Sequence, residues 1–240
     1  MADAQPQYFP TTNWNDLASI RKGDADSRQA LERICSVYWF PIYAYIRRQT
    51  FDEEHSRDLT QGFFEQLLER DTLAKVATHG GRFRSLLLTA CRNFLTDAHR
   101  HESRQQRRPP GGLLPIEPAD LENLYASAVA SNDSPERLFE RQWALTIMDR
   151  SLSQVEQEYR ERQRGELFRL LHHYLDTDPE ALSHRQTAEK LSLSEAAVKA
   201  ELHRLRQRLR EVLRREVEGT LTDPTEAFDE LNLLYRALER

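Results

Sequence analysis

The stretch LSLSEAAVKAELHRLRQRLR, residues 191–210, constrains the fold most strongly, because its apolar residues recur at helical spacing. The apolar residues are Val198, Leu202, Leu205 and Leu209, which are separated by four, three and four positions. These intervals place them on one face of an α-helix. A basic set follows one residue behind and consists of Lys199, His203, Arg206 and Arg210. The stretch therefore predicts an amphipathic helix with an apolar face beside a basic one.

Other parts of the chain have the same helical period. We expect further helices at 13–22, 27–48, 53–70, 82–104, 137–155 and 158–175. Pro41 lies within the second of these, and we expect a kink or break there. The expected core of the later helices consists of Phe139, Trp143, Ile147, Leu167, Leu170 and Leu171. No period-2 strand pattern stands out, so the sequence predicts an all-α fold.

The composition changes between residues 107 and 134, where Pro, Gly and Ser cluster. This composition is typical of a flexible linker, within which we expect a short helix near 119–130. We therefore expect two small helical domains, one at residues 1–106 and one at 135–218, joined by the linker at 107–134. An acidic tail helix is expected at 219–240. Three roles stay open for the tail: capping the second domain, holding the two domains together, or binding a partner.

Charge is segregated along the chain, although the formal net charge is only −5. Residues 52–71 carry seven carboxylates against two arginines, and residues 216–240 have the same balance, so each block has a net charge of −5. By contrast, residues 82–108 carry +5 and residues 195–215 carry +4. Evenly mixed charge is typical of a solvated surface, whereas blocks favour separate roles. The basic blocks suit the phosphates of a nucleic acid.

Several classes of protein are excluded by composition. The two cysteines, Cys35 and Cys91, lie in apolar helical patterns, so we expect buried reduced thiols rather than a disulfide framework. No apolar run approaches the roughly 20 residues of a membrane span. The first dozen residues lack the basic and apolar regions of a signal peptide. We therefore expect a cytoplasmic protein that does not insert into a membrane.

Residues 184–208 have the pattern of a helix-turn-helix. Ser183 and Gln186 fit a capping box before a short first helix, residues 192–194 form the turn, and Ser194 can cap the second helix. The first turns of such a second helix enter the DNA major groove. The expected base-edge residues are Glu195, Ala196, Lys199, Ala200 and His203, and the expected phosphate-binding residues are Arg204, Arg206 and Arg208. The alternative is an ordinary helical hairpin with a solvated basic face.

Three segments, in this order, resemble the bacterial RNA polymerase sigma factors of the extracytoplasmic-function group, a part of the sigma-70-like family. They are DLTQGFF at 58–64, RFRSLL and RNFLTD within 82–97, and residues 188–210 ending in HRLRQRLR. In that family the first docks on the polymerase β′ subunit, the second opens and reads the minus-ten element, and the third reads the minus-thirty-five element. YWFPIYAY at 38–45, residues 139–149 and the acidic tail resemble a planctomycete-type subgroup.

The resemblance implies a function and a set of site residues. It implies a sigma factor that binds core RNA polymerase, through the β′ and β subunits, and promoter DNA to direct transcription initiation. The implied polymerase-binding residues are Asp58, Gln61, Phe64 and Glu65. The implied minus-ten residues are Arg82, Phe83, Arg84, Asn93, Arg100 and Arg104, with Phe83 either stacking on a base or lying in the core. The residues given above for the helix-turn-helix would read the minus-thirty-five element, and an anti-sigma factor is left open as a further partner.

The chain departs from the family pattern at several positions. Ser192 stands where the turn usually has Gly, so we expect a less usual backbone angle or a shifted turn. Ala196-Ala197 replaces the more usual Gly-Thr, and Leu88 stands where many members have Trp. The lead-in at 134–183 is longer than typical. These departures bear on the promoter sequence rather than on the class of protein.

Two other functions compete with this interpretation. A stand-alone helix-turn-helix regulator would share the basic second helix but has no need of the acidic segment at 58–70 or the basic segment at 82–108. An enzyme would need a nucleophile–base pair, a phosphate loop or a metal site. His172 and His173 are adjacent and so point in different directions on a helix, which does not suit a shared metal. The sequence therefore predicts no catalysis, no cofactor and no metal.

Overall fold

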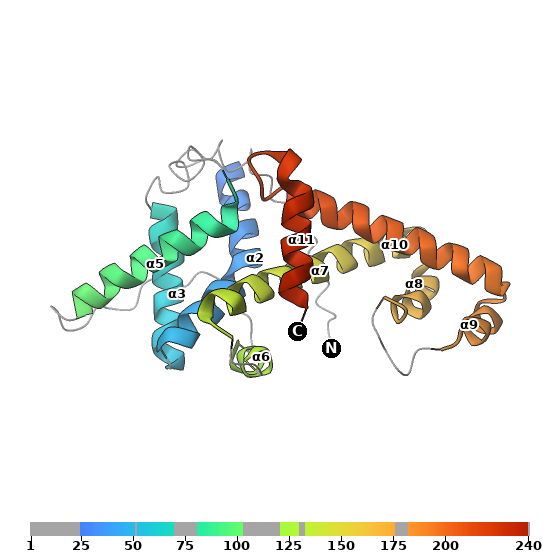
Figure 1. The fold of residues 1–240 in the computed structure, drawn as a ribbon, viewed down its shortest axis with the longest axis horizontal. Helices are drawn as coiled ribbons and strands as arrows, with labels where there is room; N and C mark the ends of the chain where they lie inside the picture. The colour runs from blue at the N-terminus through green and yellow to red at the C-terminus, as the bar shows by residue number, and fades with distance from the viewer. Residues whose placement is uncertain are drawn as a thin grey trace. The chain divides into compact units, whose positions relative to one another are not determined.

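The computed structural model describes residues 25–50, 52–69, 81–102, 121–129, 133–175 and 182–239. In these ranges the chain is all-helical, as predicted (Figure 1). The helices are α2 (Ala25–Thr50), α3 (Glu53–Glu69), α5 (Phe83–Glu102), α6 (Leu121–Ala128), α7 (Pro135–Glu161), α8 (Gly165–His172), α9 (His184–Leu191), α10 (Glu195–Glu218), the 3-10 helix η1 (Pro224–Glu226) and α11 (Ala227–Leu238). The helix expected at 13–22 lies outside the described residues. Within those ranges, no helix combines the length and apolar character needed to cross a membrane.

The described residues form two compact units. Unit 1 contains residues 147–216, and unit 2 contains the described residues up to 146 together with those from 217 onward. The division falls inside α7 and inside α10, whereas the sequence analysis places boundaries at 106, 134 and 218. The difference arises because both long helices continue past the points of division, so each contributes side chains to both units.

Aromatic side chains form much of the core of unit 2. The ring of Trp39 in α2 stacks on Phe64 of α3, with centroids 5.0 Å apart and planes inclined by 17°. Phe63 of α3 meets Phe94 of α5 edge-on at 5.8 Å. Such offset and edge-on pairs contribute about 0.5–1.5 kcal/mol each beyond the area that they bury. These contacts hold α2, α3 and α5 together.

Two helices are longer than the sequence predicts. α2 continues through Pro41 without interruption, so of the kink or break expected there the helix has no break. Pro41 is buried beside the fully buried Ile42, and this packing offsets the backbone hydrogen bond that Pro cannot make. α7 continues past Val155 to Glu161 rather than ending at 155, because Val155 and Tyr159 are both buried in one core cluster.

The short helix α6 docks within unit 2, in the segment predicted to be a flexible linker. Leu121 is fully buried. Glu122 accepts hydrogen bonds from Tyr43 and from Arg47, the latter with Nε 2.9 Å from Oε1. The Arg47 hydrogen bond holds the pKa of Glu122 below its usual value, and burial together with Glu122 raises the pKa of Tyr43. The predicted short helix is confirmed, and these contacts attach it to α2.

The C-terminal helix α11 belongs to unit 2 as well. Leu234 and Glu230 are fully buried, and Leu221, just before η1, is 3% exposed. Glu230 forms an ion pair with Arg84 of α5, which also pairs with Glu140 of α7. These contacts join the tail to Arg84, a residue of the first predicted domain.

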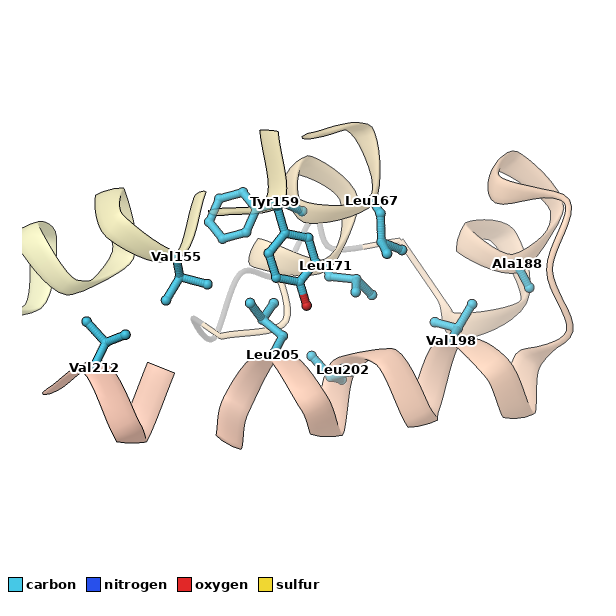
Figure 2. Packing of buried hydrophobic residues seen from close by; sticks show 10 residues of the cluster. Val155, Tyr159, Leu167, Leu171, Ala188, Val198, Leu202, Leu205 and Val212 are labelled. Carbon is cyan, nitrogen blue, oxygen red and sulfur yellow. The ribbon is translucent and has the colours of Figure 1, made fainter. Parts of the chain in front are cut away.

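Apolar side chains from four helices form the core of unit 1 (Figure 2). α7 contributes Val155 and Tyr159, and α8, α9 and α10 contribute Leu167, Leu171, Ala188, Val198, Leu202 and Leu205. Val198 and Leu205 are fully buried, and the partly buried Leu209 packs against the same cluster, so the apolar stripe predicted for 191–210 is confirmed. The predicted core residues of α7 and α8 are also buried: Phe139, Trp143, Ile147, Leu167, Leu170 and Leu171.

Candidate nucleic-acid interface

The candidate interface starts from the cap of α9. The backbone N–H of Gln186 donates to Ser183 Oγ at 3.3 Å, and the backbone N–H of Ser183 donates to Gln186 Oε1 at 2.9 Å. Both halves of the predicted capping box are therefore confirmed. The two bonds satisfy donors that the first turn of a helix leaves without backbone acceptors, and they fix where α9 begins.

The turn between α9 and α10 consists of the three residues 192–194. Ser192 has φ 54° and ψ 40°, a left-handed conformation that confirms the expected unusual backbone angle. The N–H of Leu193 then donates to the carbonyl of Ala188 at 2.9 Å, which closes the end of α9. Ser194 Oγ accepts the N–H of Ala197 at 3.1 Å, so the predicted cap of α10 is confirmed. Hydrogen bonds thus define both ends of the turn.

The first turns of α10 present an exposed polar face. The residues expected to face bases are exposed, as are the basic residues that continue the same stripe: Glu195, Ala196, Lys199, Ala200, His203, Arg206 and Arg210. Among the described residues, Lys199, His203 and Arg210 have no ion-pair partner. Arg206 donates from Nη2 to the carbonyl of Tyr174 at 3.0 Å. The buried stripe of Val198 and Leu205 therefore orients a cationic surface away from the core of unit 1.

Arg204 and Arg208 lie on the other flank of α10 and are paired with carboxylates. Arg208 donates from Nε and Nη2 to the two oxygens of Glu158, at 2.7 and 2.6 Å. This two-point hydrogen bond holds the pKa of Glu158 below its usual value. Arg204 lies 2.8 Å from Glu201, which Arg164 also binds. In this structure two of the three arginines predicted to bind phosphates are therefore paired with carboxylates of unit 1.

Phe83 occupies the core rather than an exposed position. It is 3% exposed, and its ring meets that of Tyr38 edge-on with centroids 5.1 Å apart. Of the two alternatives left by the sequence, base stacking or core, the structure has the second. Stacking on a base would require an accessible ring face.

Arg84 is also buried, at the centre of a polar cluster in unit 2. Its Nη2 donates to Glu230 Oε2 at 3.2 Å and its Nη1 to Glu140 Oε1 at 3.1 Å, while its guanidinium lies 4.8 Å from the centre of the Trp143 ring. Burial lowers the pKa of Arg84, but the two carboxylates outweigh burial and the net shift is upward. Arg82 joins the cluster with Nε 3.0 Å from Glu230. Arg82 and Arg84, two of the four arginines predicted for the minus-ten element, are thus engaged by protein carboxylates.

The outer face of α5 carries the remaining residues predicted for the minus-ten element. Asn93 is exposed, and so is Arg100, whose Nη1 lies 3.8 Å from Asp97. Arg104 lies outside the described residues. Asn93 and Arg100 are seven positions apart and therefore share one helix face.

The residues predicted to bind the polymerase divide between surface and core. Asp58 is exposed, and Gln61 and Glu65 are partly exposed and linked by a 3.0 Å hydrogen bond from Gln61 Nε2. Phe64, in contrast, is fully buried against Trp39. A partner that docks on α3 would therefore meet the three polar side chains, whereas Phe64 supports the helix from inside.

Sequence reasoning missed the carboxylates that engage the arginines. Glu158 lies 50 positions from Arg208, and Glu230 lies 146 positions from Arg84. Helical periodicity relates only residues three or four apart, so no local pattern marks such pairs. The single signal was the acidic excess of residues 216–240 beside the basic excess of residues 82–108.

In the described residues there is no group of three or more His, Cys, Asp or Glu side chains placed to hold a metal ion. The rings of the adjacent His172 and His173 have centroids 4.8 Å apart and lie at 64° to each other. A shallow pocket next to them is lined by Asp149, Leu152, Ser153, Glu156, Phe168, Arg169 and His172.

Comparison with protein-family models, curated proteins and solved structures gives no match for this chain.

Proposed function

We propose that this protein is a sigma factor that binds core RNA polymerase and directs promoter recognition. The observation that carries the proposal is the order of three segments resembling that family, each of which lies on helices. Residues 58–64 lie on α3, most of residues 82–97 on α5, and residues 188–210 on α9 and α10. A single segment of this kind has many explanations, but three in the same order have far fewer.

Each segment has a role in the proposed mechanism. Asp58, Gln61 and Glu65 bind the polymerase core from the exposed side of α3. Asn93 and Arg100 on α5 contact the melted strand of the minus-ten element, where bases leave the stack and phosphates need cations. The exposed face of α10 reads the minus-thirty-five element, because base contacts specify and phosphate contacts position.

A stand-alone helix-turn-helix regulator is the second candidate. One observation favours it: Arg82, Phe83 and Arg84 are engaged inside unit 2, while α10 presents exposed cations. In that case DNA binding would need α10 alone, and the polar face of α3 would be an ordinary solvated surface.

Binding to core polymerase separates the two candidates. The purified chain is mixed with sigma-free bacterial core polymerase and analysed by size-exclusion chromatography, beside an Asp58→Arg variant. Arg57→Glu is the matched control, because it also reverses one exposed charge of α3 but lies about 100° round the helix. We expect co-elution of the wild type and of the control, and its loss in Asp58→Arg.

Each other result has a distinct meaning. The chain could instead form no complex with core polymerase and still bind duplex DNA in a way that Lys199→Ala weakens. That result would overturn the sigma proposal in favour of the regulator. If the chain forms no complex with core polymerase and also binds no DNA, both candidates are overturned.

A further inference from the structure

Residues 220–222 are clamped to the start of α5 by backbone pairing within unit 2. The N–H of Phe83 donates to the carbonyl of Thr220 at 3.2 Å, and the N–H of Thr222 donates to the carbonyl of Gly81 at 3.4 Å. Thr222 Oγ1 also accepts the N–H of Gly81 at 2.7 Å. Gly81 has φ +109°, a conformation that side-chain-bearing residues rarely adopt. The sequence therefore supplies a residue suited to this pairing.

The carboxylate of Glu230 then engages both arginines that flank the clamp. It is fully buried, it accepts hydrogen bonds from Nε and Nη2 of Arg84, and it lies 3.0 Å from Nε of Arg82. Glu226, on η1, lies 4.0 Å from Arg82 as a second, more exposed carboxylate. Arg side chains bind carboxylates and phosphates with the same planar array of donors. Glu230 thus occupies donors that a DNA phosphate would otherwise use.

We propose that residues 220–238, which we term the C-terminal latch, compete with DNA for Arg82 and Arg84 and hold the protein in a low-affinity state. This inference rests on the proposed function, because the resemblance that carries it implies contacts of both arginines with promoter DNA. Displacing the latch frees the donors that Glu230 engages, which are Nε and Nη2 of Arg84 and Nε of Arg82, and removes an acidic segment from their neighbourhood. The apolar side chains of Leu221 and Leu234, buried at 3% and 0% exposure, favour the closed state.

The latch sets the apparent affinity through the fraction of molecules that are open. At an open fraction of about 10%, the upper end for a minor state, the apparent affinity is about one tenth of the affinity of the open state. A variant that opens the latch should therefore bind DNA about tenfold more tightly. The gain should shrink at high salt, because contacts to phosphates are salt-dependent.

The test uses the full chain and a fluorescein-labelled single-stranded DNA, followed by anisotropy at low and at physiological salt. A single strand avoids the duplex contacts proposed for α10. Glu230→Gln removes the competing charge, and Asp229→Asn is the matched control, because Asp229 is the exposed neighbour on the same helix. We expect about tenfold tighter binding for Glu230→Gln and wild-type binding for Asp229→Asn.

A second measurement needs no substitution in the cluster. Amide hydrogen exchange of α11 is compared in the free wild-type protein and with saturating single-stranded DNA. The latch predicts faster exchange of residues 230–238 in the complex, and this readout stands even where Glu230→Gln fails to fold. Unchanged or slower exchange in the complex would overturn the proposal.

The failures of the two proposals differ. Equal binding by the wild type and a folded Glu230→Gln variant would overturn the latch while leaving the sigma proposal to the polymerase experiment. Equal gains in Glu230→Gln and Asp229→Asn would also overturn it, because the effect would then be one of net charge alone. If no variant binds single-stranded DNA, both the latch and the role of α5 in the proposed function are overturned.

Discussion

At the residue scale, four of the arginines of α10 divide into two sets. Arg206 and Arg210 belong to the exposed stripe, whereas Arg204 and Arg208 pair with carboxylates of the protein. The helical period predicts which residues share a stripe, because it depends only on the sequence interval. It cannot predict that Arg208 meets Glu158, since that contact depends on how α7 and α10 pack within unit 1.

Lys199→Ala should weaken binding to a cognate promoter and relax its sequence specificity. Removal of one base-edge contact costs about 1–3 kcal/mol at the contacted position. Arg210→Ala, farther along the same exposed stripe, should weaken binding to all sequences by a similar factor and reduce the salt dependence. Competition binding with single-base variants of the site measures both. A uniform loss across sequences for Lys199→Ala would contradict its assignment to a base edge.

Arg208→Ala should destabilise unit 1, whereas Arg210→Ala should not. The two-point hydrogen bond of Arg208 to Glu158 is partly buried, with 27% and 19% of the two side chains exposed. Its loss should cost about 1–3 kcal/mol, as for hydrogen bonds to charged groups. Thermal unfolding followed by circular dichroism measures the difference. Equal melting temperatures for the two variants would contradict a structural role for Arg208.

The same pair predicts a pH dependence. The pKa of Glu158 is lowered in the folded state by Arg208, so its contribution to stability is complete above its unfolded value of about 4.3 and is lost as the pH falls through the folded value. The stability difference between the wild type and Glu158→Gln should therefore be largest near neutral pH and shrink below about pH 4. Melting temperatures of both proteins across this range provide the measurement. A difference that is constant with pH would contradict the ion pair.

At the scale of elements, periodicity and capping residues predict most helices because their causes are local. Ser183, Gln186 and Ser194 mark the ends of α9 and α10, and their hydrogen bonds are those expected. The missed features have long-range causes. α2 passes Pro41, and α7 passes Val155, because burial in a core outweighs a weak local stop signal.

Ser192→Gly should stabilise the turn. A side chain in the left-handed region costs about 1–2 kcal/mol, and part of the gain is offset because Gly raises the entropy of the unfolded chain. We expect a net gain of about 0.5–1 kcal/mol in the free energy of unfolding. Ser192→Val, with a β-branched side chain at φ 54°, should lower stability. Chemical denaturation of the three proteins gives the order, and a wild type more stable than Ser192→Gly would contradict the argument.

At the scale of the whole molecule, the sequence predicts the all-helical class and segregated charge but not where the compact units divide. Residues 216–240 and 82–108 carry opposite net charge, which fits the contact of Glu230 with Arg82 and Arg84. Charge balance alone does not say which residues meet, since every basic segment is an equal candidate. The division inside α7 and α10 likewise depends on packing that no local pattern records.

The unit division makes a prediction about where a core mutation acts. Leu234 of α11 is fully buried in unit 2, so Leu234→Ala should lower stability by about 2–5 kcal/mol through lost burial and a residual cavity. Phe228→Ala is the matched control, because Phe228 lies on the same helix and is 74% exposed. Amide hydrogen exchange should show faster exchange in α2, α5 and α11 of Leu234→Ala, and near wild-type exchange in Phe228→Ala.

The protection of backbone amides against hydrogen exchange in residues 147–216 shows whether the two units unfold separately. If unit 1 keeps its own core, the amides of α8 and α9 should exchange at the wild-type rate in Leu234→Ala, because α8 and α9 share a buried cluster with Val155, Val198 and Leu205. An equal loss of protection in α8 and α9 would mean that α7 and α10 transmit unfolding along their length. In that case the latch and the exposed cationic face of α10 would respond to the same opening event, and the DNA binding proposed for α10 would depend on the state of the C-terminal helix.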